Sequence, residues 1–320
     1  MGKVKKTFKW VGIILVSIIV LFVAAVFIFK NPTFEAPYPD IHASKDSSII
    51  ARGKAIVYGP AHCAVCHGGL ENVDKVDRGE EVALAGGFEF KLPVGVIRSA
   101  NLTSDPETGI GSRTDGELAR TLRYAVAHDG HAVFDFMPFQ NMSDEDLTAV
   151  ISYLRTLAPV KKHVERLEMN FMGDAVRAFM IKPIGPTGTP PKSVTPDSTV
   201  EYGKYLVWSV ANCRGCHTDR DMMTGAYIGP DFAGGPEFEG DKDPNFKVRP
   251  PNITTDAKTG KIANWTEQFF IERFRKGRLV KESPMPWGPF SRMSDLELKA
   301  IYRYMRTVTP VERIPGVEPK

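Results

Sequence analysis

Cysteine is scarce in this sequence, with four residues in 320. An exported chain with four cysteines could be a disulfide scaffold, but their spacing argues against one. They form two C-x-x-C pairs offset by 150 residues, and a histidine directly follows each pair. The resulting motifs are Cys63, Cys66 and His67, and Cys213, Cys216 and His217.

Acidic residues are absent from residues 1–30, which contain five lysines, and the rest of the chain has little net charge. Of the 41 basic residues, 36 lie after residue 30, where they face 38 acidic residues and leave a net charge of −2. Nucleic-acid-binding domains usually carry a clearly basic surface. We therefore expect no nucleic-acid partner.

Charge is also absent from residues 10–29, an apolar run that only Gly12 and Ser17 interrupt. As a helix, 20 such residues are long enough to cross a bilayer once, and the lysines before them predict a cytoplasmic N-terminus. Residues 1–30 are thus predicted to be a single-pass anchor in the inner (cytoplasmic) membrane, with the rest of the chain in the periplasm. The alternative is a cleaved signal peptide, for which residues 23–25 offer a weak cleavage site.

An internal repeat begins after residue 45, with equivalent positions 148–152 residues apart. It predicts two tandem domains, 46–160 and 199–312. Between them, residues 161–198 are expected to form an interdomain helix over 163–181, packed between the domains rather than against lipid or a partner, and a proline-rich linker over 182–198. The matched segments are 63–67 with 213–217, 101–105 with 252–256, 108–109 with 259–260, 137–139 with 285–287, 143–147 with 294–298, and 149–156 with 300–307.

No segment shows the apolar–polar alternation of a half-buried strand, whereas helical spacing recurs in both copies. Ser143 and Ser294, each with an acidic residue three positions later, predict helix N-caps. Gly53 and Gly203 lie inside predicted helices at equivalent places, which predicts a close helix crossing, with Tyr153 and Tyr304 as the partners. The predicted fold class is all-α: two tandem domains with separate cores after one N-terminal transmembrane helix.

The C-x-x-C-H motif is the attachment signature of c-type haem. Its two thiols add across the haem vinyl groups as thioethers, and the adjacent histidine ligates the iron. Zinc sites pair such units at short range, which an offset of 150 residues does not provide. Two covalently bound c-type haems are therefore predicted, one on each motif.

Each iron needs a sixth ligand if it only transfers electrons. The candidates in the first domain are Met137, Met142, His128 and His131. The repeat favours Met137, because Met-Pro-Phe there aligns with Met-Pro-Trp at Met285, whereas the two histidines have no counterpart in the second copy. Met142 aligns with Met293 beside a helix cap, which suits a packing role. The predicted axial ligands are His67 and Met137 for one iron and His217 and Met285 for the other.

In each copy, C-x-x-C-H is followed by N-[LI]-T-x-D-x-x-T-G, M-P-[FW], S-D-x-[DE]-L and Y-[LM]-R-T. Over residues 48–160 and 199–312 the chain resembles the dihaem and multihaem cytochrome c subunits of membrane-bound alcohol, gluconate and related dehydrogenases. The resemblance implies class I cytochrome c folds and His/Met ligation. It also implies electron transfer between a partner dehydrogenase and quinone or a terminal acceptor.

The sequence therefore predicts an electron-transfer protein, not an enzyme, in a periplasmic or membrane respiratory chain, between a dehydrogenase and quinone or a terminal oxidase. The expected partners are the membrane, through the N-terminal helix, and redox proteins such as a dehydrogenase subunit, an oxidase or a soluble cytochrome. The alternative is a dihaem cytochrome c peroxidase, which needs one iron open to peroxide and an acid or base beside it. A haem sensor would need a signalling domain, for which we see no room.

Overall fold

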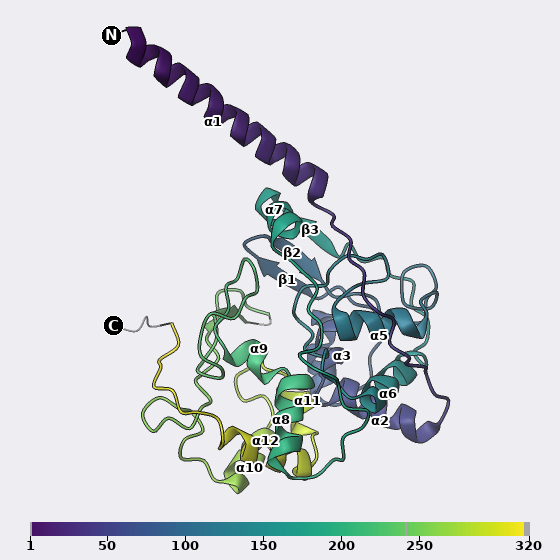
Figure 1. Ribbon diagram of the computed structural model, residues 1–320. Helices are drawn as coiled ribbons and strands as arrows, with labels where there is room; N and C mark the ends of the chain where they lie inside the picture. The colour runs from purple at the N-terminus through teal and green to yellow at the C-terminus, as the bar shows by residue number, and fades with distance from the viewer. Residues whose placement is uncertain (1, 241, 317–320) are drawn as a thin grey trace.

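The computed structural model describes residues 2–240 and 242–316, and it shows one long helix standing out from a globular body (Figure 1). The protruding helix is α1 (Gly2–Phe29). Its residues Lys6–Phe29 are long and apolar enough to cross a membrane, and only 6% of the most apolar window is buried. The other helices are α2 (Ser47–Tyr58), α3 (Cys63–His67), η1 (Leu70–Asn72), α4 (Val73–Asp77), α5 (Asp115–Tyr124), α6 (Asp144–Leu154), α7 (Phe171–Phe179), α8 (Val200–Ser209), α9 (Cys213–His217), α10 (Glu267–Arg275), α11 (Trp287–Ser291) and α12 (Asp295–Met305).

The prediction of an all-α fold is wrong, because the described residues include two small antiparallel sheets. One has the order β1-β2-β3, with Glu89 opposite Arg98 and Val96 opposite Glu168. The other pairs Phe238 with Val248. The strands are β1 (Glu89–Leu92), β2 (Gly95–Arg98), β3 (Leu167–Met169), β4 (Phe238–Glu239) and β5 (Lys247–Val248). Strands of two to four residues are too short for an alternation of apolar and polar residues to be recognised.

The predicted helix over 163–181 is correct only in its second half, where α7 lies. The first half is extended and supplies β3, which pairs with β2. The expectation that this segment packs between the two domains is not met for α7, which instead contacts α1 through Phe22–Phe171 and Phe22–Phe179 ring pairs. A strand partner about 70 residues earlier in the chain decides this local structure, and helical spacing alone does not reveal it.

The two copies of the repeat build the same helix pair, α2 against α6 and α8 against α12. A Cβ atom on Gly53 would lie 1.9 Å from the Ala149 carbonyl oxygen and 2.9 Å from Cβ of Tyr153. At Gly203 the distances to the Ala300 oxygen and Tyr304 Cβ are the same. The predicted close crossing is therefore confirmed, and only glycine fits at these positions.

The helix starts follow the predicted capping residues. The Ser143 side chain accepts a hydrogen bond from the Asp146 amide at the start of α6, and Ser294 forms a complete capping box with Glu297 at the start of α12. The helices themselves do not enclose separate cores. Buried side chains of both halves, including Leu147 and Leu298, form one continuous hydrophobic cluster, so the expectation of two independent cores is wrong.

Candidate functional site

Each C-x-x-C-H motif forms a single turn of helix, α3 in the first half and α9 in the second. The residue before each turn, His62 or Asn212, has a left-handed backbone with φ of 41° or 53°. Positions i, i+3 and i+4 of a helix share one face, so the two cysteines and the histidine of each motif lie on the same side. None of the four cysteines forms a disulfide within the described ranges, where no three His, Cys, Asp or Glu side chains group to hold a metal ion.

The motif histidines are oriented by the same contact in both halves. Nδ1 of His67 lies 2.7 Å from the Ala100 carbonyl oxygen, and Nδ1 of His217 lies 2.9 Å from that of Pro251. A carbonyl oxygen only accepts, so Nδ1 carries the proton and Nε2 is left with a lone pair, as in metal-bound histidines. Burial lowers the pKa of His67 to about 4 and also lowers the pKa of His217, which keeps both rings neutral at pH 7.

The repeated N-[LI]-T-x-D-x-x-T-G motif holds the loop that presents those carbonyls. The Asn101 side-chain amide donates to Thr108 Oγ1 at 3.2 Å and to the Val160 carbonyl at 2.9 Å. In the second half Asn252 donates to Thr259 Oγ1 at 2.9 Å and to the Val311 carbonyl at 2.7 Å. Each asparagine directly follows the residue that accepts from the motif histidine. The repeated sequence motif thus corresponds to a repeated hydrogen-bond network that holds the loop on which each histidine ring is oriented.

Met137 and Met285 are half-buried and pack against the hydrophobic cluster, which Cys63 and Cys213 also contact. Their aligned neighbours differ: Met142 and Met293 are only 1% and 3% exposed and form part of the cluster itself. The structure thus separates core methionines from methionines at the edge of the core, in the same way in both copies. The assignment of Met137 and Met285 as iron ligands stays a prediction.

The two histidines of the first half that competed with Met137 have other surroundings. Nδ1 of His131 contacts the Asp129 carboxylate, and its Nε2 lies 3.3 Å from Nη2 of Arg166. Both ring nitrogens of His131 are therefore engaged by protein groups. His128 lies in the same loop, and burial lowers the pKa of its ring.

Each half of the molecule also forms hydrogen bonds with the segment of the other half that contains Met137 or Met285. Arg220, three residues after His217, donates to the Asp135 carbonyl at 3.0 Å and to its carboxylate at 2.8 Å. Asn212, the residue before Cys213, donates to the Phe136 carbonyl at 3.4 Å. These bonds hold the two residues that precede Met137 against the second attachment turn.

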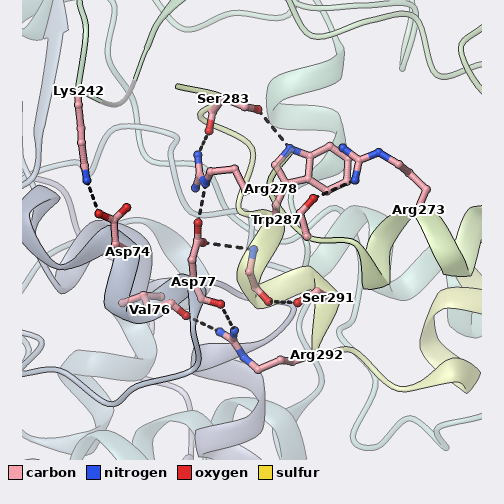
Figure 2. A network of polar contacts seen from close by, with 12 residues as sticks. Asp74, Val76, Asp77, Lys242, Arg273, Arg278, Ser283, Trp287, Ser291 and Arg292 are labelled. Atoms are coloured by element: carbon pink, nitrogen blue, oxygen red, sulfur yellow. Dashed lines mark hydrogen bonds and ion pairs between the residues drawn. The ribbon is translucent and has the colours of Figure 1, made fainter. Parts of the chain in front are cut away.

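The reverse contact is made by Asp77 at the end of α4, as Figure 2 shows. Its carboxylate accepts from Arg278 Nε at 2.5 Å and from the Gly288 amide at 3.3 Å, and its carbonyl accepts from Arg292 at 3.0 Å. The Asp77 and Arg278 side chains are 16% and 11% exposed. A Cβ on Gly288 would lie 2.3 Å from the Asp77 Cα, so the backbones meet closely. This network fixes the chain on both sides of Met285.

Sequence reasoning missed these contacts between the halves. Asp77 and Arg278 are 201 residues apart, and Asp135 and Arg220 are 85 apart. The repeat gives no signal for them, because neither pair recurs at the equivalent positions of the other copy. These contacts depend on how the two copies pack against each other. Aligning the two copies gives no information on that packing.

Comparison with known proteins gives the following relatives. The cytochrome c family model matches residues 50–158. The chain is 28% identical to the cytochrome c subunit of the quinone alcohol dehydrogenase of Gluconacetobacter polyoxogenes, over 93% of this chain and 63% of that subunit. It is 26% identical to the fructose dehydrogenase cytochrome subunit of Gluconobacter japonicus, over 90% of this chain and 57% of that one. The chain thus spans less than two thirds of the length of either subunit.

A shorter relative covers more of its own length. The diheme cytochrome c-type protein of Cereibacter sphaeroides is 24% identical over 82% of this chain and 86% of that protein. These names confirm the family resemblance that the repeated motifs indicate. Residues 50–158 thus match the cytochrome c family, and the chain as a whole is similar to the cytochrome c subunits of alcohol and fructose dehydrogenases.

Proposed function

We propose that the chain is a dihaem c-type cytochrome, with one haem bound covalently at each C-x-x-C-H turn. The observation that carries this proposal is the duplicated histidine contact, because His67 and His217 both donate Nδ1–H to a loop carbonyl and leave Nε2 available. The same set of two cysteines, a neutral imidazole and a half-buried methionine occurs in each half, which supports two haems rather than one. When bound, the haem supplies an iron that gains and loses one electron.

The roles of the chain's own residues follow from their chemistry. The cysteine pairs Cys63/Cys66 and Cys213/Cys216 would anchor the groups through thioethers, and the histidines would ligate the irons through Nε2. We assign Met137 and Met285 as the sixth ligands, since both lie half-buried at the edge of the core. A thioether as sixth ligand favours ferrous iron and raises the reduction potential.

We further propose that α1 anchors the protein in the cytoplasmic membrane and that the body lies in the periplasm. There it would carry electrons between a dehydrogenase and quinone or a terminal oxidase. The anchor is supported by the length, apolarity and exposure of Lys6–Phe29. The dehydrogenase partner is supported by the names of the relatives, which are subunits of alcohol and fructose dehydrogenases.

Haem stoichiometry tests the central proposal. The intact mass of the purified protein is expected to exceed the mass of the polypeptide by two haems, and acid-acetone is expected to leave the haem on the protein, because thioether bonds do not dissociate. Cys213→Ala with Cys216→Ala is the matched control and should retain one haem. A gain of a single haem in the unaltered protein, or extractable haem, would overturn the assignment of two sites.

Removing the Asp77 carboxylate is expected to loosen the Met285 segment. Asp77→Ala removes the acceptor for Arg278 and for the Gly288 amide, and breaking a buried ion pair is strongly destabilising. The expected result is a weaker far-red sulfur-to-iron charge-transfer band in the oxidised protein, from the second haem only. The control is Asp74→Ala, since Asp74 pairs with Lys242 at 2.6 Å on the exposed surface, where such pairs contribute about 0–1 kcal/mol. An equal band in both variants would show that Asp77 does not position Met285.

A further inference from the structure

Helix α7 has an exposed apolar side that the electron-transfer site does not use. Phe171, Met172, Phe179 and Met180 are 44–57% exposed. At 100° per residue, Phe171, Met172 and Phe179 fall on one side of the helix, and Asp174 and Arg177 fall on the other. A segment with this pattern has an apolar side that needs a partner, and the body of the protein does not cover it.

The position of α7 relative to α1 indicates the surroundings of this apolar side. The Phe22 ring lies 6.4 Å from the Phe171 ring and 6.1 Å from the Phe179 ring, and Phe29 lies 6.5 Å from Phe179. Between these contacts Val26 of α1 is fully buried. Helix α7 thus packs along the last two turns of α1, at the end of the body from which α1 departs (Figure 1).

The depth of α7 follows from helix geometry, and this step rests on the proposed role of α1 as an anchor. Twenty residues at 1.5 Å each give roughly 30 Å, the thickness of the hydrocarbon layer, so residues 10–29 would fill it. Phe22 is seven residues from the end of that run and would lie about 10 Å below the outer boundary. The rings of Phe171 and Phe179 lie 6.4 and 6.1 Å from that of Phe22, so both would lie below the outer boundary even if that whole separation ran along the membrane normal.

We propose that α7 lies in the periplasmic surface of the membrane, parallel to it, with Phe171, Met172 and Phe179 among the lipid chains. Interfacial amphipathic helices insert their apolar side by about 5–10 Å, which matches the depth that α1 imposes. The polar side fits the headgroup level: Asp174 pairs with Lys30, the first charged residue after the apolar run, at 3.7 Å. A cavity of about 380 Å³ on that side is lined by Lys30, Asp174 and Arg177. The membrane contact would thus involve two elements and hold the body at a fixed orientation.

The test measures the alkylation of single introduced cysteines by a hydrophilic maleimide, followed by mass, in full-length protein in phosphatidylcholine nanodiscs. The variants are Met172→Cys in α7, Val16→Cys in the middle of α1 and Leu296→Cys on α12. The side chains replaced are all about half exposed in the protein alone. We expect Met172→Cys to react about tenfold or more slowly than Leu296→Cys, because the reactive thiolate is unstable in hydrocarbon.

The outcomes separate the two proposals. Protection at Met172→Cys and Val16→Cys, with free reaction at Leu296→Cys, supports the inference. If Val16→Cys is protected and Met172→Cys reacts as fast as Leu296→Cys, the anchor stands, and the lipid contact of α7 is overturned in favour of a protein partner. If Val16→Cys also reacts freely, the anchor itself fails, and the depth argument fails with it. Reaction of the unaltered protein at its four native cysteines would instead contradict thioether attachment.

Discussion

Replacing Met285 by alanine is expected to lower the reduction potential of the haem on the second motif by a sizeable part of the roughly 0.8 V that axial ligation spans in haem proteins. A thioether favours ferrous iron more than the water or hydroxide that would replace it. The opened iron should become high-spin and bind carbon monoxide when reduced. Redox titration followed by optical spectroscopy measures both effects, and the first haem should keep its charge-transfer band.

The matched control is Met223→Ala, because Met223 lies in the loop after the second motif and is 37% exposed. Its removal should leave both potentials unchanged. The expected gain in Met285→Ala is weak peroxidase activity, which the unaltered protein should lack. An unaltered protein with one high-spin haem and rapid peroxide turnover would mean that a methionine is not a ligand. The peroxidase alternative would then explain the chain better than the electron carrier.

The parts of the site that were predictable from the sequence are those that local chemistry dictates. Covalent attachment needs two cysteines and a histidine within five residues, so the C-x-x-C-H turns could be located without a structure. The choice of Met137 and Met285, which stays a prediction, rests on the internal repeat, because both copies carry a Met-Pro-aromatic segment at the equivalent position. The glycine pair was recognised for the same reason, since Gly53 and Gly203 recur at one position of the repeat.

The parts that were not predictable depend on contacts between distant segments. Strand β2 pairs with β3 across about 70 residues, and neither strand exceeds four residues. The Asp77–Arg278 pair joins the two halves across 201 residues. The apolar residues of α7 alone predict a helix packed between the two domains. Its contact with Phe22 of α1 is what shows that its apolar side faces the N-terminal helix. The spacing of apolar residues in the sequence predicts that a helix side needs an apolar partner, but it does not identify that partner.

Gly53→Ala and Gly203→Ala are expected to be strongly destabilising. Overpacking usually costs about 1–3 kcal/mol, and here we expect about 3 kcal/mol or more, because the new Cβ meets a backbone carbonyl at 1.9 Å and no side-chain rotation relieves it. The α2–α6 or α8–α12 pair would have to separate. For a domain of this size, that cost corresponds to a fall of roughly 6–12 °C in Tm, measurable by loss of the Soret circular dichroism on heating.

Gly116→Ala in α5 is the matched control, because the nearest atom to its new Cβ is 3.5 Å away on the Tyr38 ring and its φ is not in the left-handed region. Alanine inside a helix is favoured over glycine by roughly 0.5–1 kcal/mol, so this variant should have an equal or higher Tm. The sign of the effect thus separates a tight crossing from a general property of helix glycines. If Gly53→Ala also raised Tm, the space between α2 and α6 would be larger than the 1.9 Å from an added Cβ to the Ala149 carbonyl oxygen indicates, and the crossing would not explain the glycine in either copy.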